Sequence, residues 1–475
     1  MIKFIQKELP AVKIVGMSLY GDQAVNLNNT KFIRFNTCQF EETDVTVFEY
    51  DHEQMTEEEI IIDFRNQLSK IPDAKAVLLL GSGLDFKISK FMKEVPKGYE
   101  DIPFFGSVAN INSSDIDSIY PYAFASHVIN CGIVAAVLSG KNLKVTTESV
   151  FGWKPIGKPL EVECGQPGSV GDTLITKIDS LPATQIYKKY LNVDPDAHFI
   201  SNICEFPLVF ERNGYLIPRV PCGYNDKGEL NTMGDVISGE KVRFTYGKTD
   251  DILKCSWEAS TRMALFAPEA IFLFVCANRA IFMKERAHEE IDWFTKISPG
   301  TLFCHGFSEL YRYNNQGGVF NSQLVIVGLR EGGKEFESRI TNAPNFTFDI
   351  KKKAEVEKVE PETVLDYTFD GGSYQKNGES PHHSHSMFER PFGKAIPLVD
   401  RLVTFLEATT DELKRMTETA NSANAAKSAF LSSMSHEIRS PINAVLGLDE
   451  MILRESAEDA IKGYARDILS SGRSL

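Results

Sequence analysis

Between residues 399 and 430, mostly apolar or small side chains recur at alternating intervals of three and four residues. The positions are Val399, Leu402, Leu406, Thr409, Leu413, Met416, Ala420, Ala423, Lys427 and Phe430. This spacing places them along one stripe of an α-helix, in the heptad pattern of a coiled coil. Such a stripe needs a partner helix. We therefore expect residues 398–430 to form a coiled-coil signalling helix and the chain to form a parallel homodimer.

The polar and small members of this stripe weaken it. A coiled coil of marginal stability can adopt two helix packings whose free energies differ by only a few kcal/mol. Such a segment is better suited to switching between conformations than to holding two chains rigidly together. After Phe430 the interval becomes four residues twice in succession, at Met434 and Ile438. Two successive fours are a stutter, which locally unwinds a coiled coil. The sequence therefore predicts a change of packing just beyond residue 430.

Two residues near the stutter have chemical and structural significance. His436 lies two residues from both Met434 and Ile438, about 200° around the helix, so it faces away from the seam. Pro441 has no N–H to bond the carbonyl of residue 437, so the helix should bend one turn beyond the histidine. Because the apolar stripe continues to residue 452, we expect the helix to pass through Pro441 and not to end at Ser440.

Residues 430–447 read F-L-S-S-M-S-H-E-I-R-S-P-I-N-A-V-L-G. This segment closely resembles the H box of the dimerisation and phosphoacceptor domain (HisKA) of sensor histidine kinases, in the variant common in hybrid kinases. The resemblance implies that His436 is the phosphoacceptor and that its imidazole attacks the γ-phosphate of ATP. It also implies that Glu437 orients the ring and accepts the proton from the other ring nitrogen. A neutral histidine, with an ordinary pKa of about 6.5, is a competent nucleophile near neutral pH.

The position four residues after the histidine usually holds Thr or Asn in this family, where it positions water for phosphatase action on a partner. Here it is Ser440, which keeps a hydroxyl group at the phosphatase position. Ser456 is a candidate N-cap for a second helix, whose apolar face would contain Ile461, Tyr464, Ile468 and Leu475. The two helices of residues 431–475 would form an antiparallel hairpin that dimerises into a four-helix bundle.

The chain stops at Leu475, which the resemblance places inside this second helix. We find no counterpart of the family's asparagine box or glycine-rich ATP lid. We therefore expect the phosphoacceptor part of a longer kinase, which binds no cofactor itself and uses ATP and Mg²⁺ held by a catalytic domain outside this chain. The phosphate would pass to a response regulator or receiver domain. A phosphocarrier that receives phosphate from a receiver aspartate is the other signalling alternative.

The first 360 residues have a mixed α/β texture. Residues 57–68 have helical apolar spacing, whereas 75–80, 133–138 and 270–277 read as buried strands. Segments around residues 76, 104 and 130 resemble later segments about 190 to 200 residues on, in the same order. We expect an α/β (α+β) sensor region with two lobes, 1–220 and 221–360. A loop-rich linker, 361–397, would join it to the all-α segment.

Short motifs in both lobes resemble the FIST sensory domain. They are L-G-S at 80–82 and F-G-S at 105–107, then C-A-N-R at 276–279, G-F-S-E-L at 306–310 and V-F-N-S at 319–322. The family usually has Gly where Ser308 stands. The resemblance implies a cytoplasmic sensor of a small ligand such as an amino acid. The candidate ligand-binding residues are Arg279, Gly306, Phe307, Glu309 and Asn321, with Arg279 pairing a carboxylate and Glu309 an ammonium group. Alternatively, Arg279 and Glu309 form structural hydrogen bonds or pair with each other.

Composition excludes several classes of function. Acidic residues outnumber basic ones by 65 to 51, a net charge of −14 that disfavours nucleic-acid binding. No apolar run approaches the roughly 20 residues of a membrane span, and charges near the N-terminus argue against a signal peptide, so we expect a cytoplasmic protein. The eight cysteines form no C-x-x-C pair and read as core thiols. We expect no metal site, and we interpret His382, His383 and His385 as part of a loop.

The sequence is also compatible with a different class of function, that of an enzyme. The first 360 residues could be an enzyme with a cysteine nucleophile, and the helical tail would then only dimerise. This requires one of Cys204, Cys222, Cys276 or Cys304 to lie beside a histidine such as His305 and to have a lowered thiol pKa. The adjacency of Cys304 and His305 proves nothing, because neighbours on a strand point to opposite faces.

Overall fold

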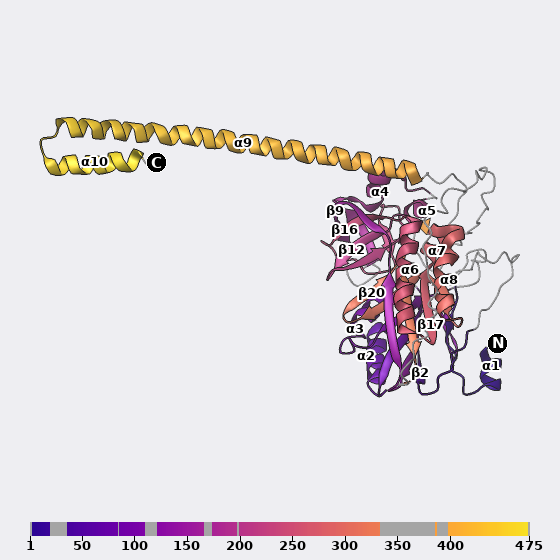
Figure 1. Cartoon of the computed structure of the whole chain (residues 1–475). Coiled ribbons are helices and arrows are strands. Elements are labelled where there is room, and N and C mark those ends of the chain that lie inside the picture. The colour runs from indigo at the N-terminus through magenta and orange to yellow at the C-terminus, as the bar shows by residue number, and fades with distance from the viewer. Residues whose placement is uncertain are drawn as a thin grey trace. The chain divides into compact units, whose positions relative to one another are not determined.

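The computed structural model describes residues 2–19, 36–83, 85–109, 121–165, 173–196, 199–332, 385–386 and 398–473. The chain divides into two compact units, Met1–Arg401 and Leu402–Leu475. The first is a mixed α/β unit and the second contains only helices (Figure 1), as the sequence predicts. Within the described residues, no helix combines the length and the apolar character that crossing a bilayer requires.

One sheet of the first unit contains six strands. Their order is β2 (Asp44–Asp51), β7 (Gly132–Ser139), β3 (Ala74–Ser82), β4 (Phe104–Val108), β19 (Ser308–Tyr313) and β20 (Gln316–Phe320). Helices α2 (Glu57–Leu68) and α3 (Ile88–Glu94) cover one face, where Phe64 and Phe91 pack on Val77 and Leu79. The predicted helix 57–68 is confirmed, and a capping box between Thr56 and Glu59 fixes where it begins.

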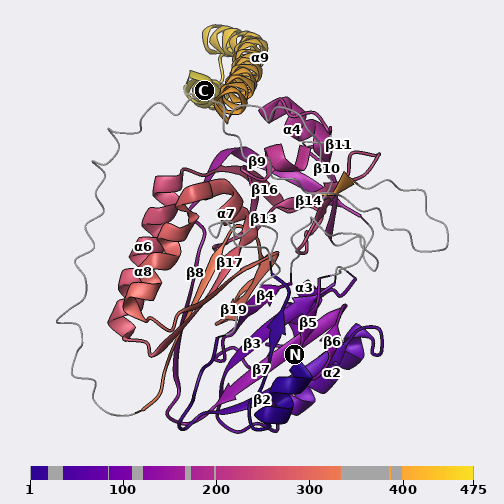
Figure 2. The same cartoon turned by 90° about the vertical axis from the view of Figure 1, so that its right-hand side faces the viewer.

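A second sheet repeats this arrangement with four strands. Their order is β18 (Leu302–Gly306), β17 (Ala270–Cys276), β21 (Leu324–Arg330) and β8 (Lys144–Val150). Helices α6 (Thr249–Phe266) and α8 (Ala287–Ile297) cover its outer face, where Met263 and Phe294 pack on Leu273 and Ile326. Figure 2 shows these helices beside β8 and β17.

The two sheets share one local topology. In each, a strand pairs in parallel with the next strand of the repeat (β3 with β4, β17 with β18) and antiparallel with a later one (β7, β21). A further strand, β2 or β8, then pairs antiparallel with that later strand. The segments that resemble each other in sequence therefore form the same supersecondary unit twice. The β19–β20 hairpin of the second copy extends the sheet of the first.

The inner faces of the two sheets pack against each other. The ring centroids of Phe105 on β4 and Phe274 on β17 lie 6.0 Å apart, and the Thr147 and Tyr311 hydroxyls are 3.3 Å apart. Successive residues of a strand point to opposite faces. The alternation therefore sends Leu79 to the helix layer and Phe105 to the space between the sheets. The resulting order of layers is helix, sheet, sheet, helix.

A third, antiparallel sheet is formed by strands from the segment between β8 and α6, together with β22 from much later in the chain. It contains β9 (Lys154–Cys164), β10 (Leu174–Ile178), β11 (Leu181–Pro182), β12 (Leu208–Arg212), β13 (Tyr215–Arg219), β14 (Pro221–Tyr224), β15 (Leu230–Thr232), β16 (Lys241–Tyr246) and β22 (His385–Ser386). Helices α4 (Ala183–Leu191) and α5 (Phe199–Ile203) accompany it. The predicted lobe boundary at residue 220 falls inside this sheet, between β13 and β14, and stays a prediction. His382 and His383 lie outside the described residues.

Smaller elements complete the first unit. Near the N-terminus are α1 (Ile2–Glu8) and a small sheet of β1 (Gly16–Met17), β5 (Ala123–Phe124) and β6 (Val128–Ile129). Helix α7 (Ala277–Met283) follows β17 directly and leads through a 3₁₀ turn into α8. These connections place α7 at the carboxyl end of β17, next to the candidate site.

The second unit is a helical hairpin. Helix α9 (Leu398–Glu455) begins in the first unit and continues through Pro441, as predicted, and α10 (Asp459–Arg473) runs back along it (Figure 1). The Glu458 backbone N–H donates to the Ser456 hydroxyl at 3.3 Å, and the Lys462 N–H donates to the Glu458 carbonyl at 3.1 Å. Glu458, and not the predicted Ser456, therefore occupies the N-cap position of α10, because the first hydrogen bond of the helix is accepted there. The buried residues Ala465 and Leu469 of α10 lie on the inner side of the hairpin.

Candidate phosphoacceptor helix and sensory core

The segment that resembles the H box lies entirely within α9. Residues 430–447 form one continuous stretch of this helix, and Ser440 and Pro441 are exposed. The side chains of His436 and Glu437 lie outside those that the structure describes, so their roles stay predictions. An exposed helical segment is what a separate catalytic domain or receiver domain needs in order to reach a phosphoacceptor.

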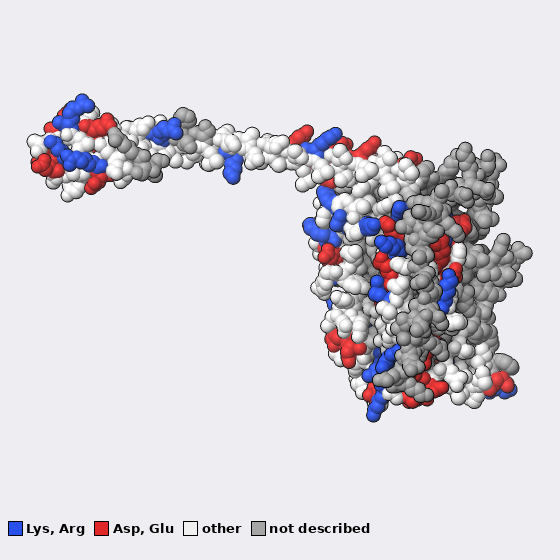
Figure 3. Space-filling view, viewed as in Figure 1, with Lys and Arg blue, Asp and Glu red and all other residues white. Residues whose placement is uncertain are grey.

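The predicted heptad stripe is uncovered in a single chain. Leu406, Leu413, Met416 and Phe430 each expose more than half of their surface. On α10, Ile461, Tyr464 and Ile468 are also exposed, although the sequence predicts them as the apolar face of that helix. Figure 3 shows few charged side chains along the middle of α9. Contiguous exposed apolar surface of this kind marks an interaction site.

In the first unit, the loop of residues 321–323 between β20 and β21 is the centre of a buried polar cluster. The Asn321 side-chain amide donates to the Ser308 hydroxyl at 2.8 Å and accepts from the Val220 backbone N–H at 3.1 Å. The Gln323 carbonyl accepts from the Cys276 backbone N–H at 3.0 Å. Ser322 has φ +57°, a left-handed conformation that is uncommon for residues other than glycine. Strained backbone of this kind often accompanies a functional site.

Arg279 contacts this loop but is fully engaged. Its guanidinium forms a buried ion pair with Glu290 of α8 at 2.7 Å and donates to the Ser322 and Phe151 carbonyls at 3.0 and 2.8 Å. Both members of the pair are buried. This geometry favours the structural alternative for Arg279, although the partner is Glu290 and not Glu309.

Glu309 differs from Arg279 in its hydrogen bonding. Its side chain is fully buried, and neither carboxyl oxygen has a hydrogen-bond partner among the described residues. Burial raises the pKa of Glu309 well above its usual range, and the nearby Cys276 thiol, the Gln323 backbone and the Arg279 charge offset this only in part. Burial therefore favours the protonated, neutral form of Glu309.

The remaining candidates lie around the same loop. The Phe307 backbone N–H donates to the Val108 carbonyl at 3.0 Å, which joins the carboxyl ends of the parallel pairs β3/β4 and β17/β18. At Gly306 a side chain would collide with Ser107. Carboxyl ends of parallel strands are the usual place for ligands in α/β sheets. The structure thus gathers Gly306, Phe307, Glu309, Asn321 and Arg279 in one region, although a ligand-binding role for them stays a prediction.

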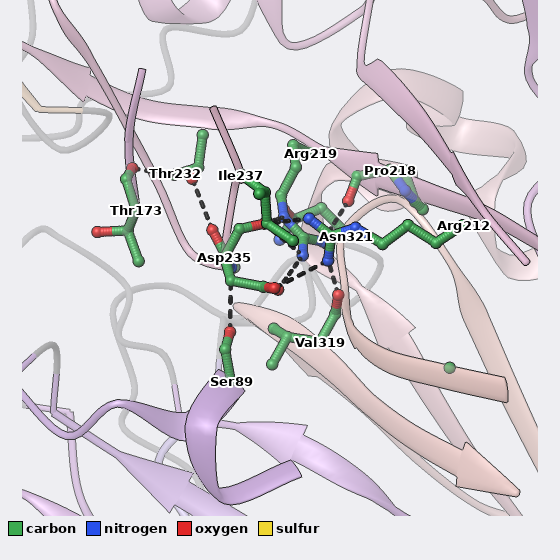
Figure 4. Close-up of polar contacts among 12 residues, drawn as sticks. Ser89, Thr173, Arg212, Pro218, Arg219, Thr232, Asp235, Ile237, Val319 and Asn321 are labelled. Atoms are coloured by element: carbon green, nitrogen blue, oxygen red, sulfur yellow. Dashed lines mark hydrogen bonds and ion pairs between the residues drawn. The ribbon is translucent and has the colours of Figure 1, made fainter. Parts of the chain in front are cut away.

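Sequence reasoning missed a second buried network beside this loop. Arg219 is 1% exposed and donates to the Asp235 carboxylate at 2.9 Å and the Val319 carbonyl at 2.7 Å, and the Asp235 backbone N–H donates to the Ser89 hydroxyl at 3.1 Å (Figure 4). Burial lowers the pKa of Arg219 to about 10. A side chain at Gly234 would collide with this guanidinium. The partners lie 16 and 100 residues from Arg219, so no local motif marks the network.

Three of the four candidate thiols, Cys204, Cys222 and Cys276, lack the environment of a catalytic nucleophile. Burial raises the pKa of Cys204 and of Cys222 to about 12, and burial together with the Glu309 carboxyl raises that of Cys276 well above its usual range. A nucleophilic thiol needs a lowered pKa. Cys304 and His305 are adjacent on β18, so their side chains point to opposite faces of the sheet. These observations weigh against the enzyme alternative.

Comparison with known protein families matches three parts of this chain. Residues 1–170 match the FIST N domain, 183–309 match the FIST C domain, and 426–475 match the His Kinase A (phospho-acceptor) domain. The chain therefore combines matches to both FIST domains with a match to the phosphoacceptor domain of histidine kinases. The comparison finds no ATPase domain of a kinase in this chain.

Curated relatives are similar to short stretches of this chain. The chain is 47% identical over 72 residues to the non-motile and phage-resistance protein of Caulobacter vibrioides, a match that covers 14% of this chain and 9% of the relative. It is 37% identical over 70 residues to histidine kinase 3 of Arabidopsis thaliana (15% and 7%) and 37% identical over 76 residues to the sensor histidine kinase AruS of Pseudomonas aeruginosa (16% and 8%). The chain spans less than a tenth of the length of these relatives.

Proposed function

We propose that this chain is the sensory and phosphoacceptor part of a cytoplasmic two-component histidine kinase. The first unit would bind a small ligand, and a homodimer formed through α9 and α10 would present His436 to a catalytic domain that holds ATP and Mg²⁺. The observation that carries the proposal is the S-H-E-I-R-S-P segment, which lies in one continuous helix of a hairpin that matches the phosphoacceptor domain.

The chemistry assigned to the chain's own residues is a single phosphoryl transfer. A ring nitrogen of His436 attacks the γ-phosphorus of ATP, the bond to the bridging oxygen of ADP breaks, and ADP leaves. Glu437 accepts the proton from the other ring nitrogen, which stabilises the charge that forms on attack. The phosphoryl group then moves from His436 to an aspartate of a response regulator.

The test is phosphorylation in trans. The full chain is mixed with a separately produced histidine-kinase catalytic domain and labelled ATP, and the label is tested for the acid lability of phosphohistidine. We expect the wild type to be labelled and His436→Gln to remain unlabelled. His288→Gln, which removes an exposed histidine of the first unit, is the matched control and should be labelled like the wild type. Equal labelling of His436→Gln and wild type would overturn the assignment.

A further inference from the structure

The first turn of α9 belongs to the first unit, and a buried arginine holds it there. The Arg401 side chain is 3% exposed, and its guanidinium donates to the Glu205 carboxylate at 2.6 Å and to the Asn202 carbonyl. It also lies over the Phe206 ring, 5.3 Å from the centroid. A buried guanidinium is stable only when such partners compensate its lost hydration. This contact therefore holds Arg401, in the first turn of α9, against the turn that follows α5.

A second contact ties that turn to the buried loop of residues 321–323. The Asn278 side-chain amide, at the start of α7, donates to the Cys204 carbonyl at 2.9 Å and to the Ser322 hydroxyl at 2.7 Å. Cys204 precedes Glu205, the carboxylate that holds Arg401. A chain of buried polar contacts thus runs from Ser322 through Asn278 and residues 204–205 to Arg401.

The helix beyond Arg401 is built to carry a change along its length. Residues 401–436 contain no glycine or proline, and all of them lie in α9. The backbone hydrogen bonds of a continuous α-helix keep its residues in a fixed arrangement. A rotation of the helix at Arg401 therefore also rotates the segment that contains His436, as long as the helix between them stays intact. Pro441, the first helix-breaking residue, comes only after His436.

We propose that Arg401 is a positioning residue for the phosphoacceptor helix, coupled to loop 321–323 through Asn278 and Glu205. The coupling rests on the proposed function, in which the first unit binds a ligand and α9 presents His436, and it places the response to that ligand at loop 321–323. Loop 321–323 holds Ser322 in a strained conformation, so a second arrangement of the loop is accessible to a ligand that favours it. Such a rearrangement withdraws the Ser322 hydroxyl from Asn278 and loosens the turn that carries Glu205.

The experiment is amide hydrogen exchange on the full chain, read from peptides that cover residues 402–412. We expect Asn278→Ala and Arg401→Gln each to speed exchange there by at least about threefold, a ratio within the range of measured coupling energies. The double variant should exchange no faster than Arg401→Gln, because Asn278 acts through Arg401. Lys154→Ala, which breaks the exposed Lys154–Asp251 pair of the same unit, should leave this exchange unchanged.

Additive effects in the double variant, or an Asn278→Ala variant with wild-type exchange at 402–412, would overturn the coupling. The charge swap Glu205→Arg with Arg401→Glu separates the ion pair from a general loss of packing. We expect either single reversal to speed exchange and the swap to restore it.

Labelling of His436 supplies a readout on function. We expect Arg401→Gln to change the labelling rate at least about threefold, and the charge swap to return it toward the wild-type rate. An unchanged rate in Arg401→Gln overturns the positioning role. If the wild type itself is not labelled, the proposed phosphoacceptor function fails, whereas the exchange experiment still decides whether Asn278 and Arg401 are coupled.

Discussion

Glu309 shows how the fold changes the acid–base behaviour of a single residue. Its folded-state pKa is raised by burial, whereas in the unfolded chain it returns to the usual value of about 4.3. A raised carboxyl pKa contributes stability that is fully present below the unfolded-state pKa and is lost as pH rises toward the folded-state pKa. The buried Glu309 carboxyl therefore makes the stability of the first unit depend on pH.

We expect Glu309→Gln to gain stability relative to the wild type as pH rises above about 4.3. The difference should grow by about 1.4 kcal/mol per pH unit for as long as Glu309 keeps its proton in the folded state. Urea unfolding at several pH values measures it. Glu211→Gln, which changes an exposed carboxyl on β12, is the control. Parallel pH curves for Glu309→Gln and wild type would contradict the prediction.

The Arg279–Glu290 pair should behave as a buried ion pair with saturated hydrogen bonds. Arg279→Gln leaves the Glu290 charge without its partner, so we expect a loss of about 3–5 kcal/mol in the free energy of unfolding. Replacing both residues by apolar ones should cost less than the sum of the single changes, since no charge is then left buried. Urea denaturation measures both. A loss as small as that of Lys154→Ala, which breaks a surface pair, would show that Arg279 is not structural.

At the scale of elements, local patterns predict helices more completely than the surfaces they bury. The helix at 57–68 follows from its apolar spacing and its capping residues, all of which lie within one segment. In α10, by contrast, Ala465 and Leu469 are the buried residues and the predicted face is exposed. Spacing identifies an apolar stripe, but it does not say which of two neighbouring stripes packs within the hairpin.

Pro441 should weaken the helix beside the phosphoacceptor. It removes one backbone hydrogen bond within α9, so we expect Pro441→Ala to stabilise this part of the helix by up to about 3 kcal/mol. Hydrogen exchange of peptides that cover residues 434–445 should slow accordingly. Asn443→Ala, in the same turn, tests whether helix propensity alone explains the change. Equal slowing in both variants would mean that the proline is not the cause.

At the scale of the whole molecule, we propose that a second copy of the chain covers the exposed apolar stripe on α9. We expect Leu413→Asp with Met416→Asp to turn a dimer into a monomer, because both side chains lie on the stripe and are exposed in a single chain. Sedimentation equilibrium measures the mass. Lys414→Asp adds the same charge off the stripe and should leave the dimer intact. A wild-type chain that sediments as a monomer would contradict the proposal.

Several properties follow from the sequence alone because the residues that determine them are neighbours in the chain. The change from an α/β texture to a helical one, the helix at 57–68, the passage of α9 through Pro441 and the resemblance to a phosphoacceptor segment all rest on local spacing or on contiguous motifs. The repeat between the two halves was also visible, because buried strands of the same type recur in the same order.

Tertiary structure decided what depends on residues far apart in the chain. The packing of the two sheets buries Glu309 without a hydrogen-bond partner among the described residues. Arg279 of α7 pairs with Glu290 of α8, and Arg219 of β13 reaches Asp235 and Val319. The attachment of Arg401 to Glu205 joins positions 196 residues apart. The physical reason is the same in each case: the energy of a buried charge depends on what surrounds it in space, and sequence spacing predicts those surroundings only within one helix or strand.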